Sequence, residues 1–243
     1  MKENPYDHAD FFNAYKNFPR SKEGLAQAGE WETLKKLLPE FTNKNVLDVG
    51  CGFGWHCLYA ASHGAKKVLG IDISKKMLAV AEEKNTFSNV NYQLCPMEEI
   101  NFSQNSFDIV LSSLAFHYTE DFKGVCEKIR GCMTKGGTFI FSVEHPIFTA
   151  EGTQEWIYDD EGQPLYFPVD HYFTEGKRET LFLGEKVVKY HRTLTSYLGT
   201  LQETGFSIEK VVEPMPSDNL LTVPGMKDEL RRPMMLIIKA VAK

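Results

Sequence analysis

Short apolar runs alternate with stretches of helical periodicity between residues 45 and 143. Apolar runs of four to eight residues bounded by glycine or polar residues are typical of buried β-strands. Their alternation with helical stretches predicts βα units that feed a mostly parallel sheet. The expected strands span Asn45–Val49, Lys67–Ile71, Val90–Leu94, Phe107–Leu111 and Thr138–Val143.

Helices are expected between these strands. One follows Gly54 and ends near His63-Gly64, and a second is capped by Ser74 and runs to about Glu83. A third spans Asp121–Cys132, and Gly136-Gly137 is expected to form the turn before the fifth strand.

The pattern changes on both sides of this core. Helical segments are expected before it at His8–Asn17 and Leu25–Leu38, where they would cap the sheet or cover a ligand. Residues 144 to 190 are rich in aromatic, proline and acidic residues, which indicates an insertion over the active face. Hairpin turns are expected in it at Asp160-Glu161-Gly162 and Gly184-Glu185. The chain then predicts a helix at Thr193–Thr204 and strands at Phe206–Val212 and Met234–Val241.

Composition narrows the classes of partner. The 27 basic and 33 acidic residues give a formal net charge of −6, which provides no broad basic field and disfavours nucleic acid as a partner. The five cysteines form no CxxC pair and the histidines no HxxxH pair, so we expect neither a disulfide framework nor a metal site. With no signal sequence and no apolar run long enough for a membrane span, the expected location is the cytoplasm.

A glycine loop follows the first expected strand. In Val46-Leu47-Asp48-Val49-Gly50-Cys51-Gly52-Phe53-Gly54 the glycines fall as GxGxG, whereas the dinucleotide fingerprint is GxGxxG. Asp48 stands two residues before the first glycine, where a carboxylate would repel a pyrophosphate and attract an ammonium group. The loop therefore favours an amino-acid-bearing ligand, with a tight strand-to-helix turn as the alternative.

A second acidic residue ends the next strand. Asp72 lies 22 residues after Gly50, where an ionised carboxylate can accept hydrogen bonds from two ribose hydroxyls. The alternative is that Asp72 only caps the following helix.

Together the segments VLDVGCGFG, GIDIS, FDIVLSSLAFHY and MTKGGTFIFSV resemble the core of class I S-adenosylmethionine-dependent methyltransferases, in particular the group with the methyltransferase type 11 domain. The resemblance implies a Rossmann-like α/β fold with a seven-stranded, mostly parallel sheet, an antiparallel last strand, helices on both faces and one insertion after the fifth strand. The chain would form one domain whose parts are a helical cap (1–40), a cofactor-binding core (41–143), a substrate-covering insertion (144–192) and a C-terminal helix and strands (193–243).

The same resemblance implies a set of residues that bind S-adenosylmethionine. The methionine part would lie against the glycine loop and near the backbone of Leu114, the ribose on Asp72, and the adenine between Ile73 and Met77. The family's usual Asp-Ala after the third strand is replaced here by Cys95-Pro96-Met97-Glu98, where Met97 and Glu98 are the expected contacts. The expected cofactor-binding residues are Asp48, Gly50, Cys51, Gly52, Gly54, Asp72, Ile73, Met77, Met97, Glu98 and Leu114.

The chemistry is expected where the fourth and fifth strands end. Both places open on the ligand side of a parallel sheet, and a third candidate run precedes the helix at Thr193. Methyl transfer requires the nucleophile to be held near the methyl carbon and a proton to be removed where necessary. The proton-handling or orienting candidates are His117, His145 and His191, and the substrate-binding candidates are Tyr118, Glu144, Tyr190 and Arg192. The alternative is that each histidine is a hydrogen-bonded loop residue.

The sequence therefore predicts a methyltransferase that acts on an unidentified small molecule, as a monomer or homodimer. The loop after the fourth strand lacks the Asn/Asp-Pro-Pro-aromatic motif of enzymes that methylate amino groups on bases or glutamine. Tyr15, Arg20 and Trp31 are candidates for closing over the cofactor carboxylate, with surface packing as the alternative. A catalytically silent module that binds S-adenosylmethionine and an NAD-dependent oxidoreductase remain as alternative functions.

Overall fold

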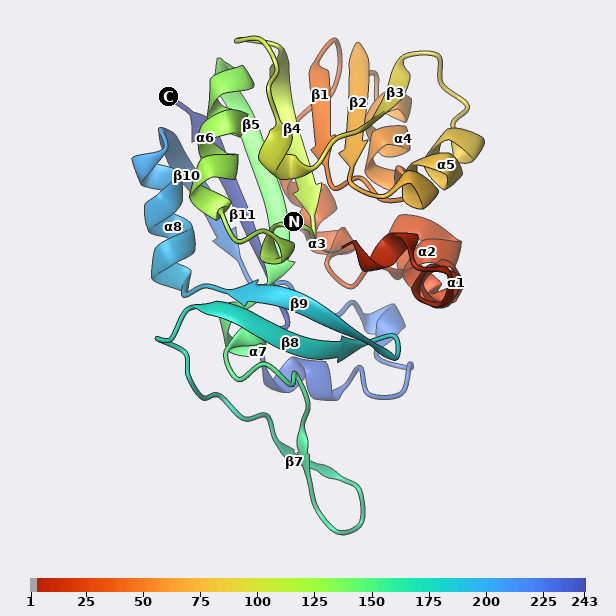
Figure 1. The fold of residues 1–243 in the computed structure, drawn as a ribbon, viewed down its shortest axis with the longest axis vertical. Helices are drawn as coiled ribbons and strands as arrows, with labels where there is room; N and C mark the ends of the chain where they lie inside the picture. Colours follow the sequence, from red (N-terminus) through yellow and green to blue (C-terminus); the bar gives the residue numbers. More distant parts are fainter. Residues whose placement is uncertain (1–3) are drawn as a thin grey trace.

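The fold is built on a seven-stranded sheet of order β10-β11-β5-β4-β1-β2-β3, seen in a computed structural model that describes residues 4–243 (Figure 1). Strand β11 is antiparallel to both of its neighbours, and the other pairings in the sheet are parallel. This confirms the predicted mostly parallel sheet with an antiparallel last strand. The strands are β1 (Asn45–Val49), β2 (Lys67–Asp72), β3 (Val90–Leu94), β4 (Phe107–Ser113), β5 (Met133–Glu144), β10 (Phe206–Val212) and β11 (Met235–Ala242).

Helices connect and cover these strands. Several begin at a side chain that accepts a hydrogen bond from a backbone amide of the first turn: Ser74 does so for α5, which the sequence predicted, and Asp121 and Thr193 do so for α6 and α8. The α-helices are α1 (Ala9–Asn17), α2 (Pro19–Glu23), α3 (Trp31–Leu37), α4 (Trp55–Ser62), α5 (Lys75–Lys84), α6 (Phe122–Cys132), α7 (Pro146–Thr149) and α8 (Leu194–Glu203). Short 3₁₀ turns are η1 (Pro5–Asp7), η2 (Gly24–Gln27), η3 (Met97–Glu99), η4 (Phe116–Tyr118), η5 (Asp218–Leu220) and η6 (Asp228–Arg231).

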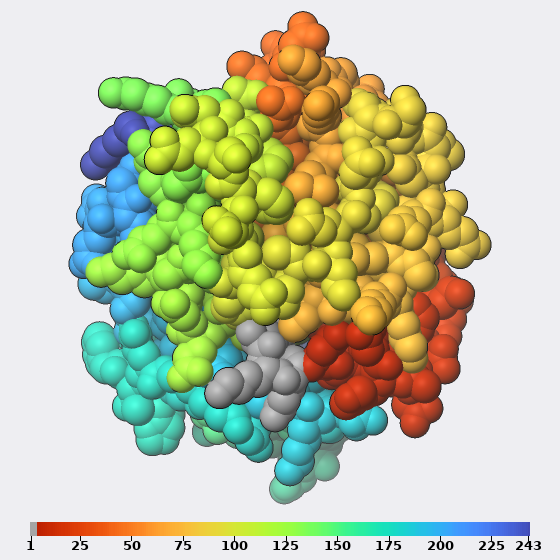
Figure 2. Space-filling view, turned by 45° about the horizontal axis from the view of Figure 1, so that its top comes forward, coloured from red at the N-terminus to blue at the C-terminus, as the bar shows by residue number. Residues whose placement is uncertain are grey.

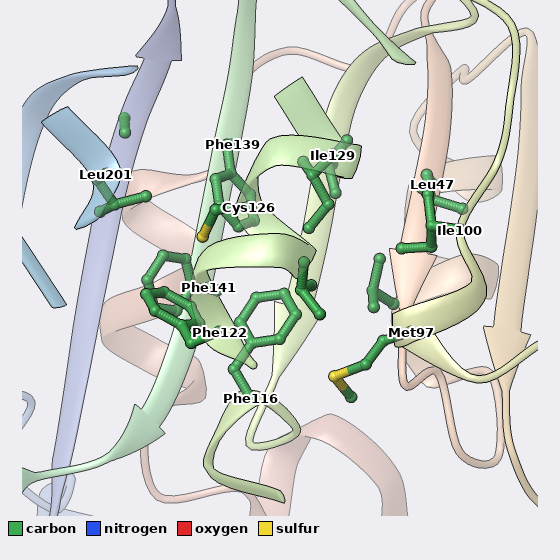
Figure 3. Close-up of a cluster of buried hydrophobic side chains, with 14 of the residues drawn as sticks. Leu47, Met97, Ile100, Phe116, Phe122, Cys126, Ile129, Phe139, Phe141 and Leu201 are labelled. Carbon is green, nitrogen blue, oxygen red and sulfur yellow. The ribbon is translucent and has the colours of Figure 1, made fainter. Parts of the chain in front are cut away.

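The sheet separates two hydrophobic cores, because successive side chains of a strand point to opposite faces. Leu47 and Val49 of β1 belong to the cluster under α6 and α8, whereas Val46 belongs to the cluster with α3 and α4. In the first cluster, aromatic rings fill the space between β5 and α6 (Figure 3). Its labelled members include Phe116, Phe122, Phe139 and Phe141, beside Cys126 and Ile129 of α6. Covered on both faces, the sheet presents its strand ends for ligand binding.

Two predicted elements differ from the structure. The expected helix Leu25–Leu38 is divided into η2 and the shorter α3, and α2 before it was not predicted. Gly136-Gly137 forms no separate turn, because β5 continues through both residues with a shift of register against β4. The shift leaves extra residues in β5, and one of them, Gly136, has a φ of +76°, which glycine tolerates.

Three segments gather at the carboxyl edge of the parallel strands, at the middle of Figure 1. They are residues 4–27, the antiparallel hairpin of β8 (Gly176–Phe182) and β9 (Glu185–His191), and the C-terminal stretch from Glu213 to Met234. The expected turns at residues 160–162 and 184–185 are confirmed, since β6 (Ile157–Tyr158) pairs with β7 (Pro164–Tyr166) and Leu183-Gly184 joins β8 to β9. Across residues 4–243, no helix is both long and apolar enough to cross a membrane.

Candidate functional site

A cavity of about 440 Å³ lies at the carboxyl edge of the sheet. The loops after β1, β2, β3, β4 and β5 form its floor, as expected for a doubly wound sheet. The N-terminal segment, Phe182 of β8 and the stretch from Pro214 to Met235 form the other walls. Among the described residues from 144 to 192, Glu144 and Phe182 alone line the cavity, so the covering role assigned to that insertion is shared with the two ends of the chain.

The three glycines of the loop after β1 serve different purposes. All three have positive φ, between +53° and +75°, which explains glycine at each position. A Cβ atom at Gly50 would lie 2.5 Å from Cβ of Ala115, and one at Gly54 would lie 2.2 Å from the hydroxyl oxygen of Tyr92. At Gly52 a Cβ atom would meet nothing within 4 Å, and Gly52 lines the cavity. Gly52 is therefore where this loop leaves room for a ligand to approach the backbone.

Asp48 lies beneath the loop and does not line the cavity. It is buried and accepts a hydrogen bond from the Cys57 thiol at 3.3 Å. Burial raises the pKa of Asp48 to about 7, so its charge at neutral pH is only partial. The expectation that an ionised Asp48 repels phosphate from this loop therefore needs correction, because the group is buried and close to half protonated. Cys51 and Gly54 also lie outside the cavity lining.

Asp72 ties the glycine loop to the start of α5. Its two carboxylate oxygens accept hydrogen bonds from the backbone amides of Gly52 and Ser74, both at 2.9 Å. Burial raises the pKa of Asp72 and these amide bonds oppose the rise. The alternative prediction was that Asp72 only caps the following helix. Asp72 does bond to the residue before α5, and its carboxylate also lines the cavity. The other predicted cofactor residues that line it are Gly50, Gly52, Ile73, Met77, Met97, Glu98 and Leu114.

A buried ion pair closes the cavity from the N-terminal side. Arg20 lies 2.9 Å from the Glu30 carboxylate and donates a 2.7 Å hydrogen bond to the hydroxyl of Ser113 at the end of β4. That hydroxyl in turn donates to Glu30 at 2.9 Å. Burial alone would raise the pKa of Glu30, but Arg20 holds it below its ordinary value. Arg20 and Tyr15 line the cavity, whereas Trp31 packs against Tyr59 outside it.

His117 is the predicted histidine that the structure brings into the cavity. It is buried, and its Nδ1 atom accepts a hydrogen bond from the backbone amide of Glu144 at 3.4 Å. Burial lowers the pKa of His117 to about 4, so the imidazole is neutral at physiological pH. With Nδ1 as an acceptor, the proton resides on Nε2, and His117 presents an N–H donor.

The buried histidines predict a loss of stability in acid. His117 and His56 have pKa values of about 4 when folded, against an ordinary value of 6.5. Below pH 6.5 the unfolded chain takes up protons that the folded chain refuses, so the stability falls until the pH reaches the folded pKa. His117→Gln should therefore lose about 2 kcal/mol less unfolding free energy than the wild type between pH 7 and 5, measured by urea unfolding.

The control for this measurement is His8→Gln, because His8 is exposed. We expect its pH profile to follow the wild type. A His117→Gln profile that also follows the wild type would show that His117 is protonated equally well in the folded and unfolded chains.

Glu144 anchors a buried polar cluster at the other side of the cavity. Its Oε1 atom accepts a 2.6 Å hydrogen bond from Lys189, and its Oε2 atom accepts a 2.7 Å bond from Gln154. Lys189 also donates to Gln154 at 2.8 Å. Nearby, the hydroxyl groups of Tyr118 and Tyr6 lie 3.1 Å apart. Glu144 and Tyr118, both predicted substrate-binding residues, line the cavity.

Four of the predicted catalytic and substrate-binding residues lie outside the cavity lining. His145 caps α7 by accepting the amide hydrogen of Ile147, and its Nε2 lies 2.8 Å from a Glu213 carboxylate oxygen. His191 lies 2.7 Å from the Thr149 hydroxyl and 2.8 Å from the Tyr172 carbonyl, so both of its ring nitrogens are engaged.

Arg192, the third of these residues, donates to the carbonyls of Phe116, Tyr190, Thr119 and Glu120 and so fixes the turn after β4. Tyr190 is the fourth, with its carbonyl as one of those acceptors. These contacts hold local structure together, and the structure does not bring His145, His191 or Arg192 into the cavity lining.

Sequence reasoning missed the C-terminal wall of the cavity. That stretch reads as an irregular segment rich in proline and methionine, without the periodicity of a helix or strand. Composition was the one signal available. Bulky apolar residues in a segment without regular structure indicate that the segment packs against another part of the protein. The cavity-lining residues from this stretch are Pro214, Pro216, Leu220, Val223, Met226, Glu229, Met234 and Met235.

Comparison with known proteins agrees with this geometry. A family model described as a methyltransferase domain matches residues 47–141. The solved structure of a Listeria monocytogenes protein assigned as an S-adenosylmethionine-dependent methyltransferase is 53% identical, with a TM-score of 0.86 over 90% of this chain and 99% of that one. An S-adenosylmethionine-dependent methyltransferase of Mesorhizobium loti is 41% identical, with a TM-score of 0.83 over 90% of this chain and 100% of that one.

A Haemophilus influenzae protein of uncharacterised function is 36% identical over 242 residues, which is 97% of this chain and 95% of that protein. The match to the methyltransferases extends over nearly their whole length, beyond the glycine loop and its strand. It sets aside both the NAD-dependent oxidoreductase and the catalytically silent module. The chain therefore belongs to the class I S-adenosylmethionine-dependent methyltransferases, and S-adenosylmethionine is its cofactor.

Proposed function

We propose that this methyltransferase acts on a small molecule enclosed beside the cofactor at the carboxyl edge of the sheet. The observation that carries the proposal is the closure of the 440 Å³ cavity by both ends of the chain and by the β8–β9 hairpin. Figure 2 shows the N-terminal segment (red) seated against the yellow residues of the core and the cyan hairpin. A cavity of this size, walled from several directions, suits small ligands better than a polymer.

Charge supports the same proposal. The formal net charge is −6, and the cavity is lined by the carboxylates of Asp72, Glu98, Glu144 and Glu229 against the single guanidinium of Arg20. Recognition of a nucleic acid depends on cationic groups that neutralise phosphates. Among residues 4–243, the lining offers no such array.

The lining residues fit S-adenosylmethionine. Its methionine part would lie against Gly50 and Gly52 with its carboxylate toward Arg20, its ribose on Asp72, and its adenine between Ile73 and the Met97 region. When bound, it supplies an electrophilic methyl group on a positively charged sulfur. The chain's own contribution is to hold the acceptor in line with that group and to exclude water, which shortens the search for a reactive geometry.

The experiment that tests the proposal measures S-adenosylhomocysteine released from the enzyme and S-adenosylmethionine. A cell extract is divided into a low-molecular-mass fraction and a fraction that contains protein and nucleic acid. We expect release with the first fraction and none with the second. Release with the macromolecular fraction alone would refute a small-molecule acceptor.

Asp72 gives a direct test of the cofactor site. Asp72→Asn removes the charge that would accept ribose hydroxyls, and hydrogen bonds to charged groups contribute roughly 1.5–3 kcal/mol, so affinity should fall about 10- to 100-fold. Titration calorimetry with S-adenosylmethionine measures this change. Asp108→Asn is the matched control, because Asp108 bonds to the amide of Asn45 away from the cavity. Equal affinity in the two variants would remove Asp72 from the cofactor site.

A further inference from the structure

The chemistry of the acceptor can be inferred from groups that the cofactor does not use. Of the charged groups that line the cavity, Asp72, Glu98 and Arg20 lie with the proposed cofactor residues. Glu144 and Glu229 remain on the acceptor side. Both oxygens of Glu229 are occupied by the two guanidinium nitrogens of Arg232, at 2.6 and 3.0 Å. Of the two, Glu144 lies beside a cavity-lining histidine, since the Nδ1 atom of His117 accepts the hydrogen of its backbone amide at 3.4 Å.

The surroundings of Glu144 keep it ionised. Burial by itself raises the pKa of Glu144, but the neighbouring Lys189 ammonium holds it below its ordinary value. Each carboxylate oxygen accepts one hydrogen bond from the protein, from Lys189 or from Gln154. Because a carboxylate has about four acceptor positions, Glu144 can accept a further hydrogen bond from a ligand.

His117 supplies the complementary group. Its Nδ1 atom is occupied by the backbone amide of Glu144, which fixes the proton on Nε2. In residues 4–243 no protein group forms a hydrogen bond with Nε2, and the side chain lines the cavity. Glu144 and His117 thus offer one acceptor and one donor side by side.

Apolar side chains form a large part of the acceptor side. Phe18 comes from the N-terminal segment, Phe182 from β8, and Leu220, Val223 and Met226 from the C-terminal stretch. Methionine and aromatic side chains pack well against flat or irregular apolar ligands. The wall therefore suits a ring-containing body.

We propose that the methyl acceptor is an uncharged phenolic or enolic hydroxyl on an apolar body, held between the Glu144 carboxylate and the Nε2–H group of His117. The inference rests on the proposed function and specifies its substrate class. A hydroxyl donates to Glu144 and accepts from His117, so it satisfies both groups at once. A carboxylate or phosphate would face the charge of Glu144, and an ammonium group would face the His117 donor without an acceptor for it.

The transfer step balances with these residues. The hydroxyl oxygen forms a bond to the methyl carbon as the carbon–sulfur bond breaks, and the bonding electrons stay on sulfur. The hydroxyl proton passes to Glu144 and then to solvent. The proton leaves as the oxygen–carbon bond forms, so Glu144 does not have to ionise the free hydroxyl, and a phenol with a pKa of about 10 gives up its proton more readily than an aliphatic hydroxyl, whose pKa lies near that of water at about 15.7. This difference in pKa favours a phenolic or enolic hydroxyl over an aliphatic one.

Two probes with one ring system test the inference: 2-naphthol and 2-naphthoic acid. Each is titrated into enzyme saturated with S-adenosylhomocysteine, and 2-naphthol is also assayed for methyl transfer with S-adenosylmethionine. We expect 2-naphthol to bind at least about tenfold more tightly than 2-naphthoic acid, because the acid places a like charge beside Glu144. Comparable affinity for the two, or no binding of 2-naphthol, overturns the inference.

Variants assign the discrimination to Glu144. Glu144→Gln alone leaves the Lys189 ammonium buried without a counter-charge, so the double variant Glu144→Gln/Lys189→Met is tested with it. The double variant should bind 2-naphthoic acid and 2-naphthol with similar affinity. Glu213→Gln, outside the cavity, should retain the wild-type preference. Retained preference in the double variant overturns the assignment. Release of S-adenosylhomocysteine with the macromolecular fraction alone would instead refute the proposed function.

Discussion

Replacing Arg20 by methionine is expected to lower the free energy of unfolding by about 3–5 kcal/mol, because it leaves the Glu30 carboxylate buried without a counter-charge. The Glu30 side chain is only 1% exposed, and its Oε1 atom lies 2.9 Å from Arg20. Ser113 would keep its hydrogen bond to Glu30, but a hydroxyl does not neutralise a carboxylate. Urea unfolding at pH 7 measures the loss.

A double variant separates stability from binding. Arg20→Met/Glu30→Gln removes both charges, so its stability should return to within about 1–2 kcal/mol of the wild type. The cavity nevertheless loses its single lining guanidinium. If Arg20 receives the cofactor carboxylate, titration calorimetry should show an affinity for S-adenosylmethionine at least about tenfold weaker. Wild-type affinity in the folded double variant would assign Arg20 a purely structural role.

The ion pair of Arg20 also shows where sequence reasoning loses information. The strands from residue 45 to 113 were predicted nearly to their ends, since each is a short run bounded by glycine or polar residues, a pattern that is local in the chain. Arg20 and Ser113 meet across 93 residues, and no local pattern encodes that contact. The sequence could therefore name Arg20 as a candidate while its partners needed the structure.

The histidines illustrate the same limit. His117, His145 and His191 each lie at the end of a strand or just after it. The sequence pattern therefore gave no reason to rank one above the others. The structure separates them by what occupies their ring nitrogens. In His191 the Thr149 hydroxyl and the Tyr172 carbonyl engage both nitrogens, whereas in His117 one nitrogen stays open to the cavity. The position of a histidine in the chain does not indicate which groups bond to its ring nitrogens.

Gly54→Ala is expected to destabilise the fold by about 2–5 kcal/mol, the sum of the strain of a left-handed residue and of overpacking. The new methyl group would lie 2.2 Å from the hydroxyl oxygen and 2.8 Å from Cζ of Tyr92, at a φ of +75°. Thermal and urea unfolding measure the loss. Adding Tyr92→Phe removes the nearest atom, so part of the stability should return. No recovery would show that the Tyr92 hydroxyl is not the atom that the new methyl group displaces.

Gly52→Ala should give the opposite pattern, although it lies two residues away in the same loop. Its methyl group meets no protein atom within 4 Å, so the loss of stability should be the left-handed strain alone, about 1–2 kcal/mol. The methyl group would instead occupy space beside the cavity where the cofactor is proposed to approach the backbone, and affinity for S-adenosylmethionine should fall at least about tenfold. Unchanged affinity in a folded Gly52→Ala protein would contradict that approach. The GxGxG pattern therefore combines two requirements, since Gly50 and Gly54 make room for Ala115 and Tyr92 of the protein itself, and Gly52 leaves room for the ligand.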